Sequence, residues 1–239
     1  MKNKDNIYNK IINVIKKNRI STTEIADCLG KKGSIEGVCA INTGHFRVGR
    51  VFLTYAYNKS NWELHEQIRE VEEGSILIVE SYDCDNKAIF GDLVSKYLIL
   101  YKGVSAIVVN GYMRDAHRLK KENYPIWCKG VTPVGCFNIK NKLSLDSKII
   151  KHWRSQYDGS IAVCDDGGVV VIPKAEINND LIEKLAFIEL QEDIWYHCID
   201  TKKWSTYDTV CLKKYLNTEL LPSELKKRFE IFIEKIDKK

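Results

Sequence analysis

The chain has 239 residues, of which 44% are hydrophobic and 29% are charged, a composition typical of a globular protein rather than a disordered one. Lys and Arg number 37 against 32 Asp and Glu, which gives a formal net charge of +5. Much of this excess lies near the two ends of the chain, where it is typical of solvated helix faces, and we expect no nucleic-acid partner.

The cysteines, the apolar runs and the N-terminal segment indicate the cellular compartment of the protein. The eight cysteines form no CxxC pair, which argues against a zinc ribbon or a thioredoxin-type motif. No apolar run approaches the roughly 18 residues of a membrane span. Lysines interrupt every apolar stretch at the N-terminus, so it does not resemble a signal peptide. We therefore expect a cytoplasmic protein with no membrane partner.

The first seventy residues predict two helices, a strand and a further helix. Residues 6–17 carry apolar side chains at helical spacing, and Ser21–Glu24 has the pattern of a capping box that opens a helix through Leu29. The β-branched and aromatic run Val51–Tyr57 predicts a strand. Residues 61–71 then predict a helix with one apolar face.

The next segment predicts a β-α-β unit. Ser75–Glu80 and Ser105–Val109 are short apolar strands, and Gly91–Tyr101 between them is an apolar helix that ends before Gly103. Such crossovers join parallel neighbouring strands, so the two chain segments that leave these strands emerge at the same edge of the sheet. We expect the pairs Gly91-Asp92 and Arg114-Asp115 to lie close together.

The remainder of the chain predicts shorter strands and then helices. Strands are expected at 126–128, 160–163 and 169–172, and helices at 179–192 and 223–236. No repeat and no linker rich in Pro or Gly divides the chain. The domain prediction is therefore one core domain over residues 1–190 and a helical C-terminal extension over residues 191–239.

The two loops that carry Gly91-Asp92 and Arg114-Asp115 form a predicted cluster. This cluster has the chemistry of an anion or metal site. A helix that opens at Gly91 presents free amides, such as those of Leu93 and Val94, to a carboxylate. Arg114 adds a permanent positive charge that could bind the same acid or stabilise an enolate.

Two carboxylates belong to the same cluster. Asp92 and Asp115 could recruit a hard divalent cation that keeps most of its ligands as water. The alternative is a structural Arg-Asp pair beside an aspartate that caps a helix, and spacing alone leaves both interpretations open.

Several segments resemble the RraA-like family, which includes the 4-hydroxy-4-methyl-2-oxoglutarate and 4-carboxy-4-hydroxy-2-oxoadipate aldolases and members named demethylmenaquinone methyltransferase. The likeness covers roughly residues 20–190 in the expected order. Its segments are "STTEIADCLG" (21–30), "VGRVFLTYA" (48–56), "GSILIVES" (74–81), the signature-like region 90–135 with "GYMRDAHRL", and "DGSIAVCDDGGVVVIPKA" (158–175).

This resemblance implies a fold and a function. The fold would be α/β, a mixed β sandwich of the swivelling phosphohistidine-domain type flanked by helices, assembled as a homotrimer or as a homohexamer built from two trimers. The function would be that of a metal-dependent carbon-carbon lyase, an aldolase or decarboxylase that cleaves a small 2-oxo acid through a pyruvate-type enolate. The alternative that the family offers is a regulator without catalysis, which binds an enzyme of RNA degradation.

The resemblance also assigns roles to the cluster. The family pattern is a Gly-Asp or Gly-Glu pair followed about twenty residues later by Arg-Asp. It implies that Asp115 binds Mg²⁺ or Mn²⁺ directly, that Asp92 holds one of the metal's water ligands, and that Arg114 stabilises the enolate. The amides after Gly91 would hold the substrate carboxylate.

Three features depart from the family pattern. Twenty-one residues separate Asp92 from Arg114, one more than the pattern has, so the helix or the loop near Tyr101 must absorb an insertion. Asn110 replaces the usual Asp before the glycine of the motif. Arg118 stands where an acidic residue is usual, and it could bind a second carboxylate or a phosphate of the substrate.

Other polar residues are weaker candidates. His117 follows the motif directly and is expected to be a surface residue rather than an acid or base. Asp165 and Asp166 precede two glycines and are expected to be turn residues rather than metal ligands. In aldolases of this family a glutamate of the neighbouring subunit enters the site, and Glu189 and Glu192 are the nearest candidates here.

Overall fold

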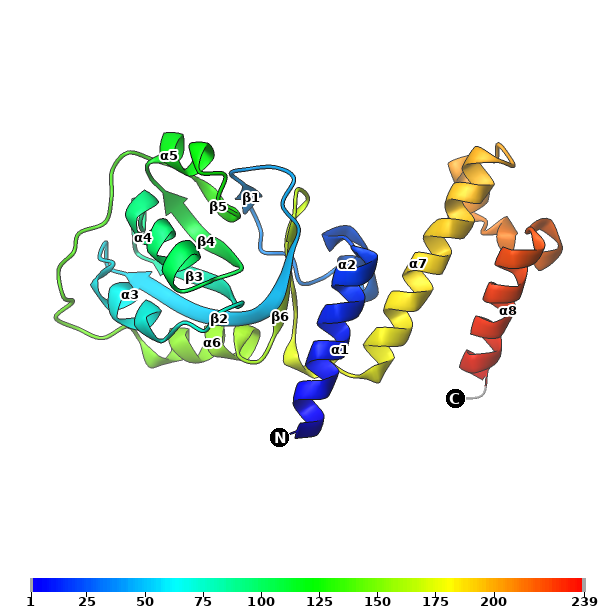
Figure 1. Cartoon of the computed structure of the whole chain (residues 1–239), viewed down its shortest axis with the longest axis horizontal. Coiled ribbons are helices and arrows are strands. Elements are labelled where there is room, and N and C mark those ends of the chain that lie inside the picture. Colours follow the sequence, from blue (N-terminus) through cyan, green and yellow to red (C-terminus); the bar gives the residue numbers. More distant parts are fainter. Residues whose placement is uncertain (1, 238–239) are drawn as a thin grey trace. The chain divides into compact units, whose positions relative to one another are not determined.

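The computed structural model describes residues 2–237 and the side chains of residues 6–234 (Figure 1). The chain divides into two compact units, one running to Asn179 and the other beginning at Asp180. The boundary at residue 190 that we expect from the sequence remains a prediction.

The first unit contains six helices and seven strands within the described residues, with a few short 3-10 and π turns between them. Its strands are β1 (Cys39–Ala40), β2 (Arg47–Tyr57), β3 (Ile76–Tyr82), β4 (Ala106–Met113), β5 (Ile126–Val131), β6 (Ile161–Asp165) and β7 (Gly168–Ile172). Its helices are α1 (Lys2–Asn18), α2 (Thr22–Cys28), α3 (Trp62–Gln67), α4 (Asp92–Lys96), α5 (Ala116–Lys121) and α6 (Ser147–Tyr157). The capping box predicted at Ser21 and Glu24 is present at the start of α2.

The strands form one mixed sheet in the order β1-β5-β4-β3-β2-β6-β7, which confirms the predicted α/β class. Strands β2, β3, β4 and β5 are parallel to one another, whereas β1 pairs antiparallel with β5 and β6 pairs antiparallel with β2 and β7. The long strand β2 pairs with β6 through its first residues and with β3 through the rest, so it joins the hairpin to the parallel part (Figure 1).

The β3-α4-β4 unit positions the candidate site, and its parallel pairing is as predicted from the apolar runs. Strand β4 is longer than expected, because pairing with β5 resumes at Tyr112 and Met113 after a register shift. The consequence is that β4 carries the chain to Met113, directly before Arg114, at the same edge of the sheet as the loop before α4.

The extra residue between Asp92 and Arg114 coincides with a π turn. Helix α4 continues as a π turn over Tyr97–Tyr101, in which the amide of Lys102 donates to the carbonyl of Tyr97, five residues earlier, at 3.1 Å. A π turn holds one residue more than an α-helical turn between its bonded groups, so it accommodates an insertion without moving the helix start. Gly103 follows with a φ of +65°, the left-handed conformation that ends many helices.

Side chains alternate across the sheet and form a core on each face. Leu77 and Val79 of β3 pack with the helices α3 and α4, whereas Ile76 and Ile78 face α6 and the β6-β7 hairpin. Helix α6, which we did not expect from the sequence, buries Trp153 and Tyr157 in the second core.

The second unit is helical. It consists of α7 (Asn179–Asp200), a series of short turns between Tyr207 and Leu220, and α8 (Ser223–Asp237). Helix α7 is longer than the predicted 179–192. A separate apolar cluster holds this unit together, formed by Leu190, Ile194, Cys198, Tyr215, Leu221 and Phe229.

No helix in the described part of the chain is long and apolar enough to cross a membrane.

Candidate functional site

A small pocket of about 120 Å³ lies where the loop before α4 meets the loop after β4. The pairs that we expected to lie together do so: the amide of Arg114 donates to the carbonyl of Phe90 at 3.0 Å, which ties the two loops. The pocket is lined by Asn61, His65, Ala88, Ile89, Phe90, Gly91, Leu93, Val94, Arg114, Asp115, Gly135, Cys136 and Asn138.

Two glycines make room for the Arg114-Asp115 pair. A Cβ atom on Gly91 would lie 2.0 Å from Oδ2 of Asp115 and 2.8 Å from Cγ of Arg114. Both distances are shorter than contacts that real Cβ atoms make, so only glycine fits this position while the pair keeps its place. A Cβ atom on Gly135 would lie 2.9 Å from Nη1 of Arg114, so the guanidinium lies directly against that backbone.

Asp115 adopts a left-handed backbone conformation with φ 59° and ψ 33°. Aspartate tolerates this region better than most residues, but the conformation still costs on the order of 1 kcal/mol. The side chain makes no capping bond to α5, although Asp115 is the residue that precedes this helix. Instead, Oδ2 accepts a hydrogen bond from the amide of Asp92 at 3.2 Å and lies 3.6 Å from Nε of Arg114. The carboxylate therefore faces the pocket and is 36% exposed.

The start of α4 presents backbone amides to the same pocket. The amide of Ser95 donates to the carbonyl of Gly91 at 3.1 Å, one turn into the helix. The amides of Leu93 and Val94 lie within that first turn, where the helix offers no acceptor four residues earlier. These amides suit an anion, as expected for a substrate carboxylate. The Leu93 side chain is 79% exposed.

Asp92 and Arg118 form an ion pair, with 3.2 Å between Oδ2 and Nη1. The sequence raised Arg118 as a residue that could bind a second anionic group of the substrate, whereas in the structure its guanidinium meets a carboxylate of the chain itself. Any cation near Asp92 therefore competes with Arg118 for that carboxylate.

The residues present fit a divalent cation that keeps most of its water. No group of three or more His, Cys, Asp and Glu in the described part of the chain could hold a metal ion. The donor set in the pocket is one carboxylate, Asp115, whereas Asp92 does not line the pocket and meets Asp115 through its backbone amide. Mg²⁺ is commonly bound through only one or two carboxylates, with water and substrate oxygens completing its six ligands.

Sequence reasoning missed two polar residues of the pocket wall. Asn61 is buried, its Nδ2 donates to the carbonyl of Ile89 at 2.7 Å, and its Oδ1 has no hydrogen-bond partner. Burial lowers the pKa of His65, which favours a neutral imidazole in the pocket wall. Neither residue lies in the β-α-β segment, where the sequence predicts the site. The only feature of the sequence that pointed to Asn61 and His65 was their place in the first half of the helix predicted at 61–71.

The weaker candidates lie elsewhere. His117 is exposed on α5 and does not line the pocket. Asp165 accepts hydrogen bonds from the amide and hydroxyl of Thr22 and from the amide of Gly167, and Asp166 accepts one from the amide of Gly44. These bonds agree with the expectation that both are turn residues.

The glutamates expected to reach a neighbouring subunit's site, Glu189 and Glu192, lie on α7 in the second unit. Their predicted role remains untested.

The known proteins similar to this chain include a relative named as an aldolase and the longer protein DlpA. A protein of Halalkalibacterium halodurans that carries the provisional name 4-hydroxy-4-methyl-2-oxoglutarate aldolase is 29% identical over 171 residues, 68% of this chain and 77% of the relative. Protein DlpA of Legionella pneumophila is 22% identical over 199 residues, 79% of this chain. This alignment spans only 31% of DlpA, so the chain corresponds to less than a third of that relative.

Solved structures share the fold. A Pseudomonas syringae protein without an assigned function has a TM-score of 0.61 at 20% identity, over 81% of this chain and 93% of that one. RraAS2 of Streptomyces coelicolor, described as an unusual member of the RNase ES inhibitor RraA family, has a TM-score of 0.59 at 23% identity, over 77% and 95%. Residues 22–171, well over half of the chain, match the family described as Aldolase/RraA, and this protein therefore belongs to the RraA-like family.

Proposed function

We propose that this protein is a divalent-metal-dependent carbon-carbon lyase that cleaves or decarboxylates a small 2-oxo acid. The observation that carries the proposal is the space at Gly91. Because this residue has no side chain, the carboxylate of Asp115 fits directly beside the guanidinium of Arg114. The provisional aldolase name of the Halalkalibacterium halodurans relative supports the same reaction class.

The metal would bind at Asp115, and Asp92, whose amide donates to that carboxylate, would hold one of the metal's water ligands. Mg²⁺ and Mn²⁺ are the ions that suit this set of oxygen donors. When bound, such an ion would supply positive charge that polarises the carbonyl group of a 2-oxo acid.

The chain's own residues would bind the substrate and stabilise its developing charge. The amides of Leu93 and Val94 would hold the carboxylate at C1 of the 2-oxo acid. Arg114 would donate hydrogen bonds to the C2 oxygen, where negative charge develops as the enolate forms. The guanidinium lies directly against Gly135 at the pocket wall, so its charge is already close to the place where the negative charge would develop.

The reaction that this arrangement suits breaks the bond between C3 and C4. In a 4-hydroxy-2-oxo acid, the hydroxyl at C4 loses its proton and becomes a carbonyl, while the electron pair of the broken bond forms the enolate of pyruvate. In oxaloacetate, C4 leaves as carbon dioxide and the same enolate remains. Protonation at C3 then gives pyruvate in both cases.

The test is pyruvate release by the purified protein with Mg²⁺ or Mn²⁺ and either oxaloacetate or a 4-hydroxy-2-oxo acid. Arg114→Ala and Asp115→Ala should each lower kcat/KM by about a hundredfold or more, because each removes a charge from the reacting centre. Lys120→Ala is the matched control, since Lys120 is an exposed cation of α5 that does not line the pocket.

Absence of turnover on all of these substrates with metal present would refute the lyase proposal. If the protein then also showed no metal-dependent change in thermal stability and co-purified with RNA-degrading enzymes, the regulator alternative would be favoured.

A further inference from the structure

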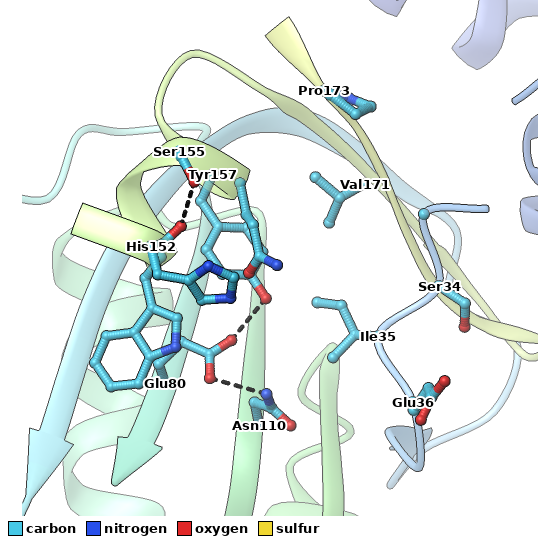
Figure 2. A pocket seen from close by; sticks show the side chains of 13 residues that line it. Ser34, Ile35, Glu36, Glu80, Asn110, His152, Ser155, Tyr157, Val171 and Pro173 are labelled. Carbon is cyan, nitrogen blue, oxygen red and sulfur yellow. Dashed lines mark hydrogen bonds between the residues drawn. The ribbon is translucent and has the colours of Figure 1, made fainter. Parts of the chain in front are cut away.

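A second and larger pocket, of about 610 Å³, shares no residue with the Arg114 pocket. Its walls come from the loop at Gly33–Glu36, the last half of α6, Val171 of β7 and Pro173 (Figure 2). Glu80 follows Ile76 and Ile78 on β3 at a spacing of two residues, so it points to the face of the sheet that α6 covers. The two pockets therefore belong to different faces of the sheet.

A buried carboxylate lies among the lining residues of this second pocket. Glu80 is only 4% exposed, and it accepts hydrogen bonds from the hydroxyl of Tyr157 at 2.6 Å and from Nδ2 of Asn110 at 2.8 Å (Figure 2). Both donors are neutral, and Glu80 forms no ion pair within the described residues.

The electrostatic surroundings leave the Glu80 carboxylate short of positive charge. Burial raises its pKa, and the two hydrogen bonds together with the charges of Lys129 and His152 offset this only in part. His152 lines the pocket, whereas Lys129 does not, and no Lys or Arg is among the lining residues.

The neighbouring amide holds the carboxylate in place. Nδ2 of Asn110 is committed to Glu80, while its Oδ1 is buried and has no hydrogen-bond partner. Because Oδ1 is not exposed to the cavity, the polar contact of a ligand falls on the Glu80 carboxylate. Apolar side chains, including Ile35, Trp153 and Val171, form the remaining walls.

We propose that this pocket binds a small organic cation that carries several N–H donors and an apolar body, such as an amidinium, a guanidinium or a primary ammonium compound. One N–H group would donate to Glu80, while the apolar body packs against Ile35 and Val171. The ligand class is opposite in charge to that of the Arg114 pocket, where a guanidinium and helix amides suit an anion.

Three probes of nearly the same shape test the charge preference: benzamidine, benzamide and benzoate. Binding is followed by protein NMR chemical shifts during titration at pH 8. Benzamidine should bind at least about tenfold more tightly than benzamide, because both donate an N–H group to Glu80 but only benzamidine brings a positive charge to the carboxylate. Benzoate should not displace benzamidine.

Two variants locate the probe. Glu80→Gln keeps the side-chain shape and should weaken benzamidine binding by about tenfold. Ser155→Trp changes an exposed residue of the wall, leaves the Glu80 network intact and should block binding by filling the space. Arg114→Ala is the control from the other pocket and should leave benzamidine affinity unchanged.

The proposal fails if benzamidine and benzamide bind equally, if neither causes shifts up to its solubility limit, or if Ser155→Trp and Glu80→Gln both retain wild-type affinity. It fails as well if Arg114→Ala abolishes benzamidine binding, because the probe would then occupy the other pocket. None of these outcomes depends on lyase activity, so the two proposals stand or fall separately.

Discussion

The guanidinium of Arg118 lies 3.2 Å from the carboxylate of Asp92, although the two residues are 26 positions apart in the chain. Asp92 is also bound through its amide to the carboxylate of Asp115. The ion pair thus brings a positive charge next to the two carboxylates that we propose for a divalent cation. This places Arg118 in a position to weaken metal binding as well as to influence the choice of substrate.

Arg118→Ala should therefore strengthen Mn²⁺ binding. Removing a unit charge near a largely solvated site changes the binding free energy by about 1 kcal/mol, which corresponds to roughly fivefold in Kd. Thermal stability should change little, because exposed ion pairs contribute about 0–1 kcal/mol. Titration of Mn²⁺ followed by electron paramagnetic resonance measures the effect.

Lys120→Ala again serves as the control, since it removes an equal charge from the same short helix at an exposed position. If both variants strengthen Mn²⁺ binding equally, the effect comes from net charge rather than from the pair with Asp92. Unchanged affinity in Arg118→Ala would show that the arginine does not compete with the metal.

Gly91→Ala should abolish metal binding and lyase activity together. The added Cβ atom would meet Oδ2 of Asp115 at 2.0 Å and would force the carboxylate out of the pocket. We expect a loss of about a hundredfold or more in kcat/KM, similar to the loss of a group at the reacting centre. Mn²⁺ affinity and pyruvate release report the two consequences.

Gly135→Ala is the informative comparison, because its Cβ atom would meet only the flexible end of Arg114, at 2.9 Å. Mn²⁺ affinity should be retained while kcat falls. If Gly91→Ala keeps normal Mn²⁺ affinity, Asp115 is not the ligand that we propose.

The sequence predicted the part of the site that depends on topology. Two apolar strands and a helix that ends before Gly103 are sufficient to infer parallel neighbours, and parallel neighbours bring Gly91 close to Arg114 and Asp115. Their closeness could be predicted although more than twenty residues lie between them, because the β-α-β connection has one strongly preferred hand.

The sequence did not reveal features that depend on side-chain packing. The Asp92–Arg118 pair arises from how α4 and α5 lie together, and no spacing rule connects the two residues. The π turn was expected only as one surplus residue, to be absorbed by the helix or by the loop near Tyr101, and the sequence did not show that it would take the form of a π turn. Helix α6 does carry sequence signals: Asp146 caps it, and Ile149, Ile150, Trp153 and Tyr157 recur at helical spacing.

Glu80→Gln should stabilise the fold at neutral pH and have little effect in acid. Burial raises the pKa of Glu80 above its ordinary value of 4.5, so the folded chain binds more protons than the unfolded chain between these two values. The stability contributed by protonated Glu80 is fully present below pH 4.5 and is lost as the pH rises through the folded-state pKa. Glutamine cannot ionise and keeps that stability.

Urea denaturation of the wild type and the Gln variant over a range of pH provides the measurement. The difference in the free energy of unfolding should be small in acid and should grow as the pH rises. A difference that does not vary with pH would show that Glu80 titrates normally in the folded protein.

The π turn at the end of α4 should tolerate the deletion of Leu100. The hydrogen bond from Lys102 to the carbonyl of Tyr97 spans five residues, so removing one residue between them gives the four-residue span of an α-helix. Leu100 is 58% exposed, and its loss removes little buried surface. The start of α4 keeps its place, so Mn²⁺ binding should be retained and Tm should fall by no more than about 4 °C, equivalent to roughly 1 kcal/mol.

Deletion of Lys151 from α6 is the matched control, because α6 is a regular α-helix in the same unit and Lys151 is exposed. Removing one residue there rotates the C-terminal half of the helix by about 100° relative to its N-terminal half, which takes Trp153 and Tyr157 out of register with the core they fill. The free energy of unfolding of that variant should fall by about 3 kcal/mol or more. If deleting Leu100 costs as much as deleting Lys151, the π turn is an integral part of the helix rather than the place where an extra residue is absorbed.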